Sequence, residues 1–470
     1  MNIKLDNEKL HGAVEIPASK SFLHRALIAS ALTKICSGKA GAWDELCAKY
    51  SDVNDDVTAT MKSLKTITAK KMEIAQKNGG AGDGKAENRA GKDKGERYID
   101  SKDVNMGMLP DTSVRCGESG TTLRLLMPLT AALGIDMAYM CGKRLYERPM
   151  TPLILQLESH GVSVIKAPMC VNSENASGML CTVGRLKPGH FVLPGNVSSQ
   201  FVSGLLFALP LLEETSTIKI NGALQSAPYV RMTLAVLDLA GIHVKINEEL
   251  TWFEVEGGQK YDYSYPEVEG DWSGAANFVV AGAIGKIYDT RGKYSNPLIN
   301  SEMKTDENGS YIECGDIKLY NLSLDAVQGD KEIVRLVNGM SENLDRNIEI
   351  NIDDCPDIAP ILAVFAAVRR GETTFTGTAR LKMKESDRVE STCNLIRSLG
   401  GKIFAGENHF TVYGKGELTG GTVEVYNDHR IAMAAAIAAR MCSEPVIIMN
   451  AECVSKSYNK FFEDYGSLQW

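Results

Sequence analysis

The feature that most constrains the fold is a repeated pattern of an amphipathic helix, a glycine and a short β-like run. It occurs at residues 153–164, 230–246 and 388–404, with Gly161, Gly241 and Gly400 as the breaks. Glycine after a helix adopts the left-handed turn that ends the helix without steric cost. The breaks lie 80 and 159 residues apart, and a weaker copy falls at 331–339. A period near 80 in 470 residues predicts about six α/β units, three in each half.

Three segments interrupt this pattern. Residues 65–97 are rich in Lys, Glu, Gly and Ala, and residues 291–308 are polar without periodicity. Such segments bury too little apolar surface to order a chain, so we expect two solvated insertions. The polar stretch 263–270, which contains Pro266 and Gly270, is expected to be a crossing between two domains.

Composition excludes several classes of protein. The chain is 44% hydrophobic and 23% charged, as globular chains are, and its net charge of −8 argues against nucleic acid or an anionic membrane as partner. The 11 cysteines form no Cys-x-x-Cys pair, which argues against a metal site or a disulfide framework. No signal-peptide core and no apolar run of membrane-spanning length occurs. We therefore expect a cytoplasmic protein with reduced thiols, no metal and no other cofactor.

Basic residues recur where loops pass into expected helices. Cations at helix starts oppose the helix dipole unless an anion is bound there. A charge run is usually a solvated face, but seven cations share this placement in both halves of the chain: Lys20, Arg25, Arg148, Lys384, Arg388, Arg430 and Lys456. Gathered in one cleft, they would repel by a few kcal/mol per close pair at an effective dielectric of about 20. The pattern predicts a cleft that binds anionic small molecules and closes on them.

Small polar residues accompany these cations. Residues 117–124 form a glycine- and threonine-rich loop before an apolar helix, but they lack the lysine of a Walker A motif. Ser198-Ser199-Gln200 and Ser226 stand at two further helix starts, where hydroxyl groups and backbone N–H groups suit phosphate. Asp357 precedes an apolar run, where it either caps a helix or faces the cleft.

Taken in this order, the motifs resemble those of the 5-enolpyruvylshikimate-3-phosphate synthase family, from Ile16 to about Phe462 apart from the two insertions. The shared motifs are Pro17-Ala18-Ser19-Lys20-Ser21, residues 117–124, Glu147-Arg148-Pro149, Ser198-Ser199-Gln200, residues 384–388 and residues 427–430. The resemblance implies an α/β fold of two similar domains, each of three βαβαββ units, like an inside-out α/β barrel with its helices inside. It implies a first domain of residues 22–265 and a second domain of residues 1–21 and 266–470.

The resemblance also implies a reaction. The enolpyruvyl group of phosphoenolpyruvate passes to the 5-hydroxyl of shikimate 3-phosphate through a tetrahedral intermediate, and phosphate is released. This step belongs to the synthesis of chorismate and the aromatic amino acids. It needs no metal or cofactor, glyphosate inhibits it, and a monomer is implied.

The site residues follow from the same resemblance. Shikimate 3-phosphate is expected to bind Lys20, Ser21, Arg25, Ser198, Ser199, Gln200, Ser226, Asp357 and Lys384. Phosphoenolpyruvate is expected to bind Lys20, Gly120, Arg148, Gln200, Arg388, Arg430 and Lys456. Asp357 is implied to be the base for the 5-hydroxyl and Glu385 the acid toward the methylene carbon, with Lys20 as the third catalytic residue.

Three positions depart from the family pattern, and one of them is Leu125, where some members have Pro. Position 118 is Glu where many members have Asn, and an extra carboxylate near phosphoenolpyruvate is unfavourable unless it turns away or pairs with a cation. Arg380 replaces an Asn that contacts shikimate in some relatives, so that role is not carried over. Gly120 is retained, which implies sensitivity to glyphosate because a side chain there would crowd the inhibitor.

Two alternatives stay open. The sister family, the UDP-N-acetylglucosamine enolpyruvyl transferases, would place Asn after the first Lys and a reactive Cys before its Arg-Pro pair. Here Ser21 follows Lys20, and Cys141 is mismatched in position. A non-catalytic anion-binding relative would be favoured by the loss of Asp357, Glu385 or Lys20, and all three are present.

Overall fold

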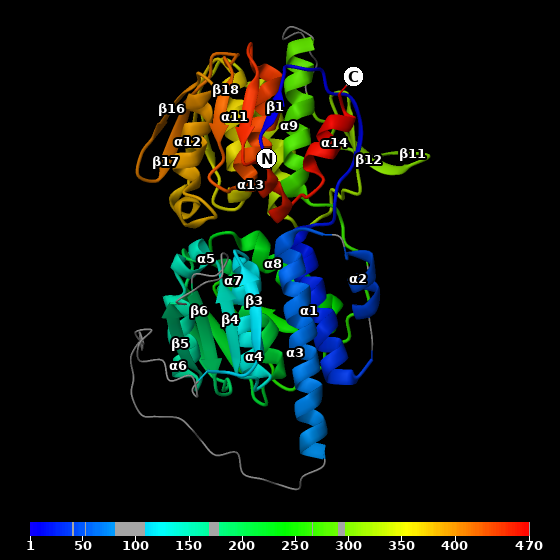
Figure 1. Cartoon of the computed structure of the whole chain (residues 1–470), viewed down its shortest axis with the longest axis vertical. Coiled ribbons are helices and arrows are strands. Elements are labelled where there is room, and N and C mark those ends of the chain that lie inside the picture. The colour runs from blue at the N-terminus through cyan, green and yellow to red at the C-terminus, as the bar shows by residue number, and fades with distance from the viewer. Residues whose placement is uncertain are drawn as a thin grey trace. The chain divides into compact units, whose positions relative to one another are not determined.

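The computed structural model describes residues 1–39, 42–51, 53–79, 109–168, 178–265, 267–289 and 297–469. They form two compact units (Figure 1). We call Ser21–Glu267 the N-terminal unit, and Met1–Lys20 with Val268–Trp470 the C-terminal unit.

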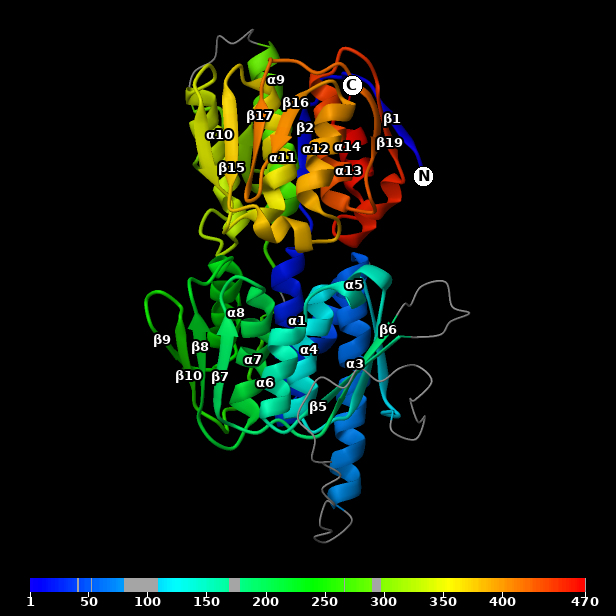
Figure 2. The ribbon, with the colours of Figure 1, turned by 90° about the vertical axis from the view of Figure 1, so that its left-hand side faces the viewer.

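The N-terminal unit contains two sheets in its described residues. Its elements are α1 (Lys20–Ser37), α2 (Trp43–Lys49), α3 (Asp55–Gly79), β3 (Ser113–Gly117), α4 (Gly120–Ala132), β4 (Met137–Cys141), α5 (Lys143–Glu147), α6 (Thr151–Ser159), β5 (Ser163–Pro168), β6 (Gly178–Val183), β7 (His190–Pro194), α7 (Ser199–Ala208), η2 (Leu209–Leu211), β8 (Ser216–Asn221), α8 (Ala227–Leu239), β9 (Val244–Ile246) and β10 (Trp252–Val255). Figure 2 shows α4 and α7 between the two sheets of this unit.

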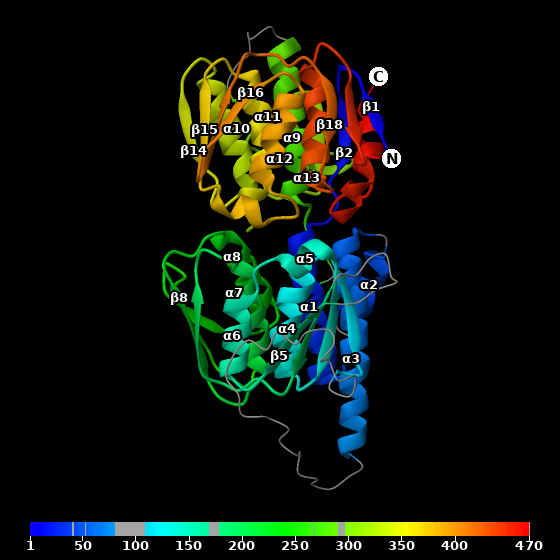
Figure 3. The ribbon, with the colours of Figure 1, turned by 60° about the vertical axis from the view of Figure 1, so that its left-hand side comes forward.

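The C-terminal unit contains three sheets in its described residues. Its elements are β1 (Ile3–Leu5), β2 (Gly12–Glu15), α9 (Trp272–Asp289), β11 (Lys304–Asp306), β12 (Gly309–Cys314), β13 (Ile317–Tyr320), η3 (Gly329–Glu332), α10 (Ile333–Glu342), β14 (Ile348–Asn351), η4 (Pro356–Ile358), α11 (Ala359–Val368), β15 (Glu372–Thr376), η5 (Ala379–Met383), α12 (Arg388–Ser398), β16 (Lys402–Ala405), β17 (His409–Tyr413), β18 (Gly421–Glu424), α13 (His429–Ala438), η6 (Ala439–Met441), β19 (Val446–Met449), η7 (Ala451–Lys456) and α14 (Phe461–Ser467). Figure 3 shows α9, α11 and α13 side by side.

Three four-stranded sheets share one topology. Their strand orders are β3-β4-β6-β5, β7-β8-β10-β9 and β14-β15-β17-β16. In each sheet the first two strands are parallel and the other pairs are antiparallel. A parallel pair needs a crossover, and α4, α7 and α11 supply it. These three βαβαββ units are three of the six that the repeat predicts, and each holds one of the predicted glycine breaks.

The two remaining sheets each take a strand from the first twenty residues. β2 pairs with β13 in parallel, in a sheet of order β11-β12-β13-β2. β1 pairs with β19 in the antiparallel sense, in a sheet of order β1-β19-β18. These pairings hold the start of the chain in the C-terminal unit.

The three predicted glycine breaks end helices in the same way. Gly161, Gly241 and Gly400 have φ of 92°, 71° and 80°, the left-handed region that favours glycine. Gly241 donates its N–H to the carbonyl of Asp238, and Ile242 donates to that of Leu237, both at 2.9 Å. The same pair of bonds follows Gly161 and Gly400. The weaker copy predicted at 331–339 is wrong, because Gly339 lies inside α10.

Helices at the centre of each unit are apolar on all sides. Every residue of α11 and α13 is buried, as is every residue of α7 except Gln200. A helix that is apolar all round has no face suited to water, so it packs in the interior. The polar residues of these helices are therefore concentrated in the turns that precede them and in their first turns.

Part of each predicted insertion belongs to the folded structure. Residues 65–79 form the second half of α3, where Ile67 is fully buried, and residues 80–97 lie outside the described residues. Residues 291–296 also lie outside them, whereas Leu298 and Ile299 belong to the core and β11 pairs with β12. Isolated apolar residues within these polar stretches are therefore buried in the folded structure. Of the predicted crossing, Pro266 lies outside the described residues.

Candidate active site

Hydrogen bonds join the N-terminal parts of four helices of the N-terminal unit in two pairs. Arg25 of α1 donates from Nη2 to the carbonyl oxygen of Tyr229, at the start of α8, over 3.0 Å. Gln200, at the start of α7, accepts from Arg124 Nη1 over 2.9 Å and donates to Thr121 Oγ1, at the start of α4, over 2.8 Å. We call these N-terminal parts, with Ser21 and the loop before α6, the N-terminal cluster.

Arg25 is the most deeply buried cation of this cluster. It is 1% exposed and donates to the carbonyl oxygen of Ser21 over 2.6 Å and to Thr233 Oγ1 over 2.8 Å. Burial lowers the pKa of Arg25 to about 10, so the guanidinium stays charged at neutral pH. None of the ion pairs within the described ranges involves Arg25. A buried cation with neutral oxygen partners is suited to an anionic ligand.

Two guanidinium groups converge on Gly120. A Cβ at this position would lie 2.9 Å from Arg148 Nη1 and 3.4 Å from Arg124 Nη1. Arg124 also lies over the ring of Phe201, with its Cζ 5.4 Å from the ring centroid. The sequence motif included Arg124 without giving it a role. The sequence did offer a signal for such a role, because Arg124 is a charged residue inside an otherwise apolar helix.

Three of the predicted serines stand before or at helix starts and are buried. Ser198 caps α7, where its Oγ accepts from the N–H of Gln200 over 3.3 Å. Ser199 is the first residue of α7 and is 3% exposed. Ser226 precedes α8 with φ of 56° and is 1% exposed. Ser21 is partly exposed in the first turn of α1.

Arg388 organises a second group of residues, in the C-terminal unit. It is 1% exposed and donates to Asp357 Oδ1 and Glu385 Oε2, each over 2.6 Å. Its Nε donates to Asp428 Oδ2 over 2.8 Å. Three carboxylates from the starts of α11, α12 and α13 thus share one guanidinium. We call this group, with Lys384 and Arg430, the C-terminal cluster.

Asp357 is the carboxylate of this cluster that lies closest to several cations. Lys384 Nζ donates to its Oδ1 over 3.0 Å, and Arg430 Nη2 lies 3.9 Å from its Oδ2. Burial alone raises the pKa of Asp357, but the charges of Lys384, Arg388 and Arg430 outweigh burial and hold the pKa well below the usual value. The pKa of Lys384 is lowered by burial despite this partner. Asp357 is therefore ionised at neutral pH.

This arrangement corrects one expectation from sequence. We expected the helix-start cations to repel one another until an anion bound. Lys384 and Arg388 instead have carboxylate partners at 3.0 Å or less, and Arg430 lies 3.9 Å from one. Aspartates and a glutamate from the same loops supply the negative charge, so mutual repulsion does not dominate this cluster.

Sequence reasoning missed Asp428 as a member of the cluster. Asp428 is fully buried, and its Oδ1 accepts from the N–H of Arg430 over 2.9 Å, which caps α13. Ser386 Oγ also donates to it, over 2.9 Å. The cap could have been recognised from Asp before an apolar helix. The ion pair to Arg388, 40 residues away, could not.

His429 and Asp330 are further buried titratable groups that sequence reasoning missed. Burial lowers the pKa of His429 well below 6.5, and the charges of Arg430 and Lys20 add to this, so the ring is neutral. Neither ring nitrogen has a hydrogen-bond partner within the described ranges. Burial raises the pKa of Asp330 to about 7, and the charge of Asp357 adds to this rise. No sequence signal distinguished either residue from an ordinary polar one.

Lys20 and Lys456 complete the placement of the predicted residues. The backbone N–H of Lys20 donates to Asp271 Oδ2 over 3.1 Å, within the C-terminal unit. The effect of Lys20 on the pKa of His429 shows that its charge lies near the start of α13. Lys456, at the end of η7, donates to the carbonyl oxygen of Asn427 over 2.7 Å. Both lysines therefore belong with the C-terminal cluster.

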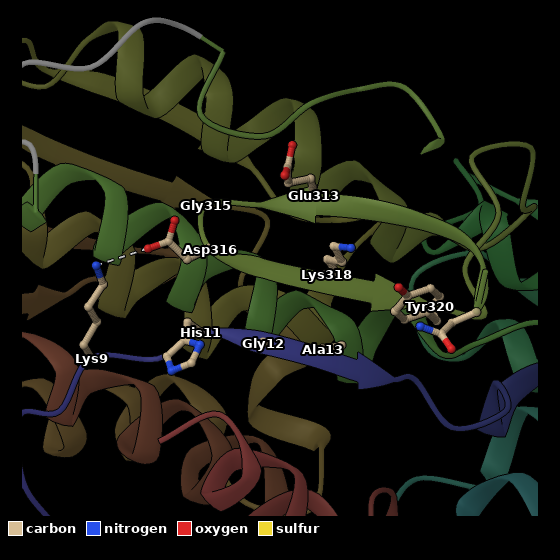
Figure 4. Close-up of a pocket in the computed structure, with 10 residues that line it drawn as sticks. Lys9, His11, Gly12, Ala13, Glu313, Gly315, Asp316, Lys318 and Tyr320 are labelled. Carbon is tan, nitrogen blue, oxygen red and sulfur yellow. Dashed lines mark ion pairs between the residues drawn. The ribbon is translucent and has the colours of Figure 1, made fainter. Parts of the chain in front are cut away.

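A separate cavity of about 570 Å³ lies on the sheet that contains β2, β12 and β13 (Figure 4). None of the predicted site residues lines it. Its charged groups pair with neighbours: Lys9 lies 3.3 Å from Asp316, and Lys318 lies 2.8 Å from Asp306. The cavity therefore lacks the excess positive charge that two anionic substrates require.

Metal centres and membrane spans do not occur in the described residues. Among them no group of three or more His, Cys, Asp or Glu residues could hold a metal ion, and none of their helices is long and apolar enough to cross a membrane. Ten cysteines fall within the described ranges, and all ten are free thiols.

Comparisons with known proteins agree with the residue motifs. A family model described as EPSP synthase (3-phosphoshikimate 1-carboxyvinyltransferase) matches residues 6–465. The chain is 34% identical to a 3-phosphoshikimate 1-carboxyvinyltransferase of Clostridium perfringens strain SM101, over 98% of this chain and 96% of the relative. It is 32% identical to the enzyme of that name from Brachyspira hyodysenteriae, over 100% and 99% of the two chains.

Solved structures show the same fold. EPSP synthase from Acinetobacter baumannii superposes with a TM-score of 0.60, covering 100% of this chain and 98% of that one, at 20% sequence identity. At this identity the likeness supports the fold alone.

Proposed function

The chain belongs to the EPSP synthase family, and from this premise we propose that it transfers the enolpyruvyl group of phosphoenolpyruvate to the 5-hydroxyl of shikimate 3-phosphate, with release of phosphate. The observation that carries the proposal is the contact of Asp357 with Lys384 and Arg388, close to Arg430. It joins a carboxylate that can accept a proton to cations that can hold an anion.

We assign shikimate 3-phosphate to the serines and Arg25 of the N-terminal cluster, with Lys20, Gln200, Asp357 and Lys384. The buried guanidinium of Arg25 and the hydroxyl groups beside it suit a phosphate group. The donor Lys384 and the acceptor Asp357 suit the hydroxyl groups of the sugar-like ring.

We assign phosphoenolpyruvate to Gly120 and Arg148 of one cluster and to Arg388, Arg430 and Lys456 of the other, with Lys20 and Gln200. At Gly120 the absence of a side chain leaves room beside two guanidinium groups. This contact supports the expected sensitivity to glyphosate, because a Cβ on Gly120 would displace Arg148.

The proposed chemistry needs one proton removed and one delivered. Asp357 takes the proton of the 5-hydroxyl, and its ionised state at neutral pH meets that requirement. Its lowered pKa makes it a weak base while three cations lie beside it. Phosphoenolpyruvate bound by Arg388 and Arg430 would offset their charge and so raise the pKa of Asp357.

Glu385 is proposed to protonate the methylene carbon. Its carboxylate accepts from Arg388 over 2.6 Å, which stabilises the ionised form. Engagement of Arg388 by the substrate weakens that bond and favours the protonated form that an acid needs. Lys20 completes the catalytic set by neutralising charge on the reacting groups.

Both alternatives from the sequence are less well supported. The UDP-N-acetylglucosamine enolpyruvyl transferases would use a reactive thiol, whereas Cys141 is 1% exposed in β4 and the family match is to EPSP synthase. A non-catalytic relative would not need the retained Asp357, Glu385 and Lys20. We also propose that the protein is a monomer and that it acts in the cytoplasm.

The test is phosphate release by the purified protein given phosphoenolpyruvate and shikimate 3-phosphate, with a chelator present and no added metal. We expect release that requires both substrates and that glyphosate inhibits. Release with UDP-N-acetylglucosamine in place of shikimate 3-phosphate would assign the sister activity. If no phosphate is released with shikimate 3-phosphate or with UDP-N-acetylglucosamine, the proposal is contradicted.

A further inference from the structure

We propose that Glu118 is a positioning residue for phosphoenolpyruvate, which acts by capping α5 and thereby holding Arg148 over Gly120. The inference rests on the proposed function, because it concerns residues assigned to that substrate. It also accounts for a carboxylate at a position where an extra negative charge was expected to be unfavourable.

Glu118 supplies the cap that α5 cannot supply itself. The N-cap position of α5 is Gly142, which has no side chain to accept a hydrogen bond. Glu118 Oε2 accepts from the N–H of Leu145 over 2.7 Å, and Oε1 accepts from that of Arg144 over 3.3 Å. These are the two amides that an N-cap side chain normally satisfies. The carboxylate is therefore engaged by backbone donors.

The capped helix leads directly to Arg148. The carbonyl oxygen of Leu145 accepts from the N–H of Arg148 over 3.2 Å, so one residue joins the Glu118 bond to the arginine. Arg148 Nη1 in turn lies where it would contact a Cβ on Gly120 at 2.9 Å. The loop that carries Glu118 and Gly120 is also tied to α5 by the bond from the N–H of Gly142 to the carbonyl of Gly117, over 2.7 Å. The loop and the arginine are thus held against each other.

Gly142 provides an independent way to disturb this cap. A Cβ on Gly142 would lie 2.3 Å from Glu118 Oε1 and 2.6 Å from its Cδ. The backbone of Gly142 has φ of −66°, which alanine adopts without strain. Gly142→Ala should therefore expel the carboxylate while leaving its charge near Arg148. In the double variant Glu118→Ala/Gly142→Ala, the methyl group at position 142 meets no carboxylate.

The experiment is a double-mutant cycle of Glu118→Ala and Gly142→Ala, read as the KM values of both substrates and kcat. We expect Glu118→Ala to raise the KM for phosphoenolpyruvate about fivefold, the effect of losing one capping contact, and to leave the KM for shikimate 3-phosphate within about twofold. Gly142→Ala should raise the first KM further, because the freed carboxylate competes for Arg148. The double variant should return to the value of Glu118→Ala.

Two further variants separate positioning from general damage. Glu118→Gln keeps one acceptor oxygen and should fall between wild type and Glu118→Ala. Glu213→Gln changes an exposed glutamate that lies 3.7 Å from Arg185, and it should change neither KM. Thermal unfolding of each variant controls for folding.

The outcomes distinguish this inference from the proposed function. A wild-type enzyme without turnover on the two substrates would overturn the proposed function. An active wild type whose Glu118→Ala variant keeps its KM for phosphoenolpyruvate, or shifts both KM values equally, would overturn the inference alone. Additive effects of the two substitutions would also overturn it, since they would show that the methyl group acts without the carboxylate.

Discussion

At the scale of the residue, the candidate site depends on how each charge is compensated. Arg25 is buried among carbonyl and hydroxyl oxygens, whereas Arg388 is buried among three carboxylates. The two residues are equally buried, but they differ in how much of their positive charge neighbouring groups compensate. Arg25 offers a full positive charge, while Arg388 becomes available as its bonds to Asp357 and Glu385 are exchanged for bonds to a ligand.

The base role of Asp357 is tested by Asp357→Asn. The amide keeps the size of the side chain and an oxygen that can accept from Lys384 and Arg388, so substrate binding should persist. Turnover should fall by about a hundredfold or more because no proton can be accepted. Binding of shikimate 3-phosphate by calorimetry and kcat by phosphate release separate the two effects. Near-normal kcat would remove Asp357 from the base role.

Asp330 should make stability depend on pH. Its pKa is about 7 in the folded protein against an ordinary value of 3.8, so folding binds a proton between these values. The stability it supports is complete below pH about 4 and is lost as the pH rises through about 7. Asp330→Asn cannot ionise, so its free energy of unfolding relative to wild type should rise over this range, by at most about 4 kcal/mol.

Denaturant unfolding at pH 5 and pH 8 measures this difference, and the exposed Asp238→Asn provides the control. A relative stability of Asp330→Asn that is the same at both pH values would contradict the assigned pKa.

At the scale of the element, helix ends were the most predictable part of the fold. The three glycine breaks were read from sequence because the left-handed turn depends on the glycine and its immediate neighbours. The extent of α3 was not predictable in the same way. Its polar second half is helical where Ile67 packs into the core, a contact that composition does not reveal.

Two of these turns give a matched pair of substitutions. A Cβ on Gly241 would meet no atom within 4 Å, so Gly241→Ala should cost only the left-handed backbone, about 1 kcal/mol. A Cβ on Gly400 would lie 2.5 Å from Thr419 Oγ1, so Gly400→Ala should cost more. Calorimetric unfolding of both variants measures the difference. Equal losses would show that the contact with Thr419 relaxes freely.

At the scale of the whole molecule, each unit places its candidate residues at the starts of helices, and α7, α11 and α13 are buried along the rest of their length. The chain carries a net charge of −8, yet both clusters contain several lysine or arginine side chains. Helix starts are where a buried helix can present polar groups, because its remaining length is apolar. Each repeated βαβαββ unit therefore provides a helix start at which polar groups can bind a ligand.

Ligand-induced stabilisation tests whether residues of both units bind shikimate 3-phosphate. At a hundred times its dissociation constant the ligand should stabilise the protein by about 2.7 kcal/mol. Arg25→Gln in one unit and Lys384→Met in the other should each reduce the thermal shift at fixed ligand concentration. A shift reduced by only one of these variants would assign the ligand to that unit alone.

What the sequence determined by itself was local: the repeat, its glycine turns and the residue types at the helix starts. Such features depend on neighbours a few positions away, so a single chain displays them. The tertiary structure decided which charges meet, as when Arg388 finds Asp357 and Asp428, 31 and 40 positions away, and when Glu118 turns to cap α5. Coulomb energy and hydrogen bonding fall off over a few ångströms in space. Distance along the chain therefore cannot reveal these partners, and only folding brings them together.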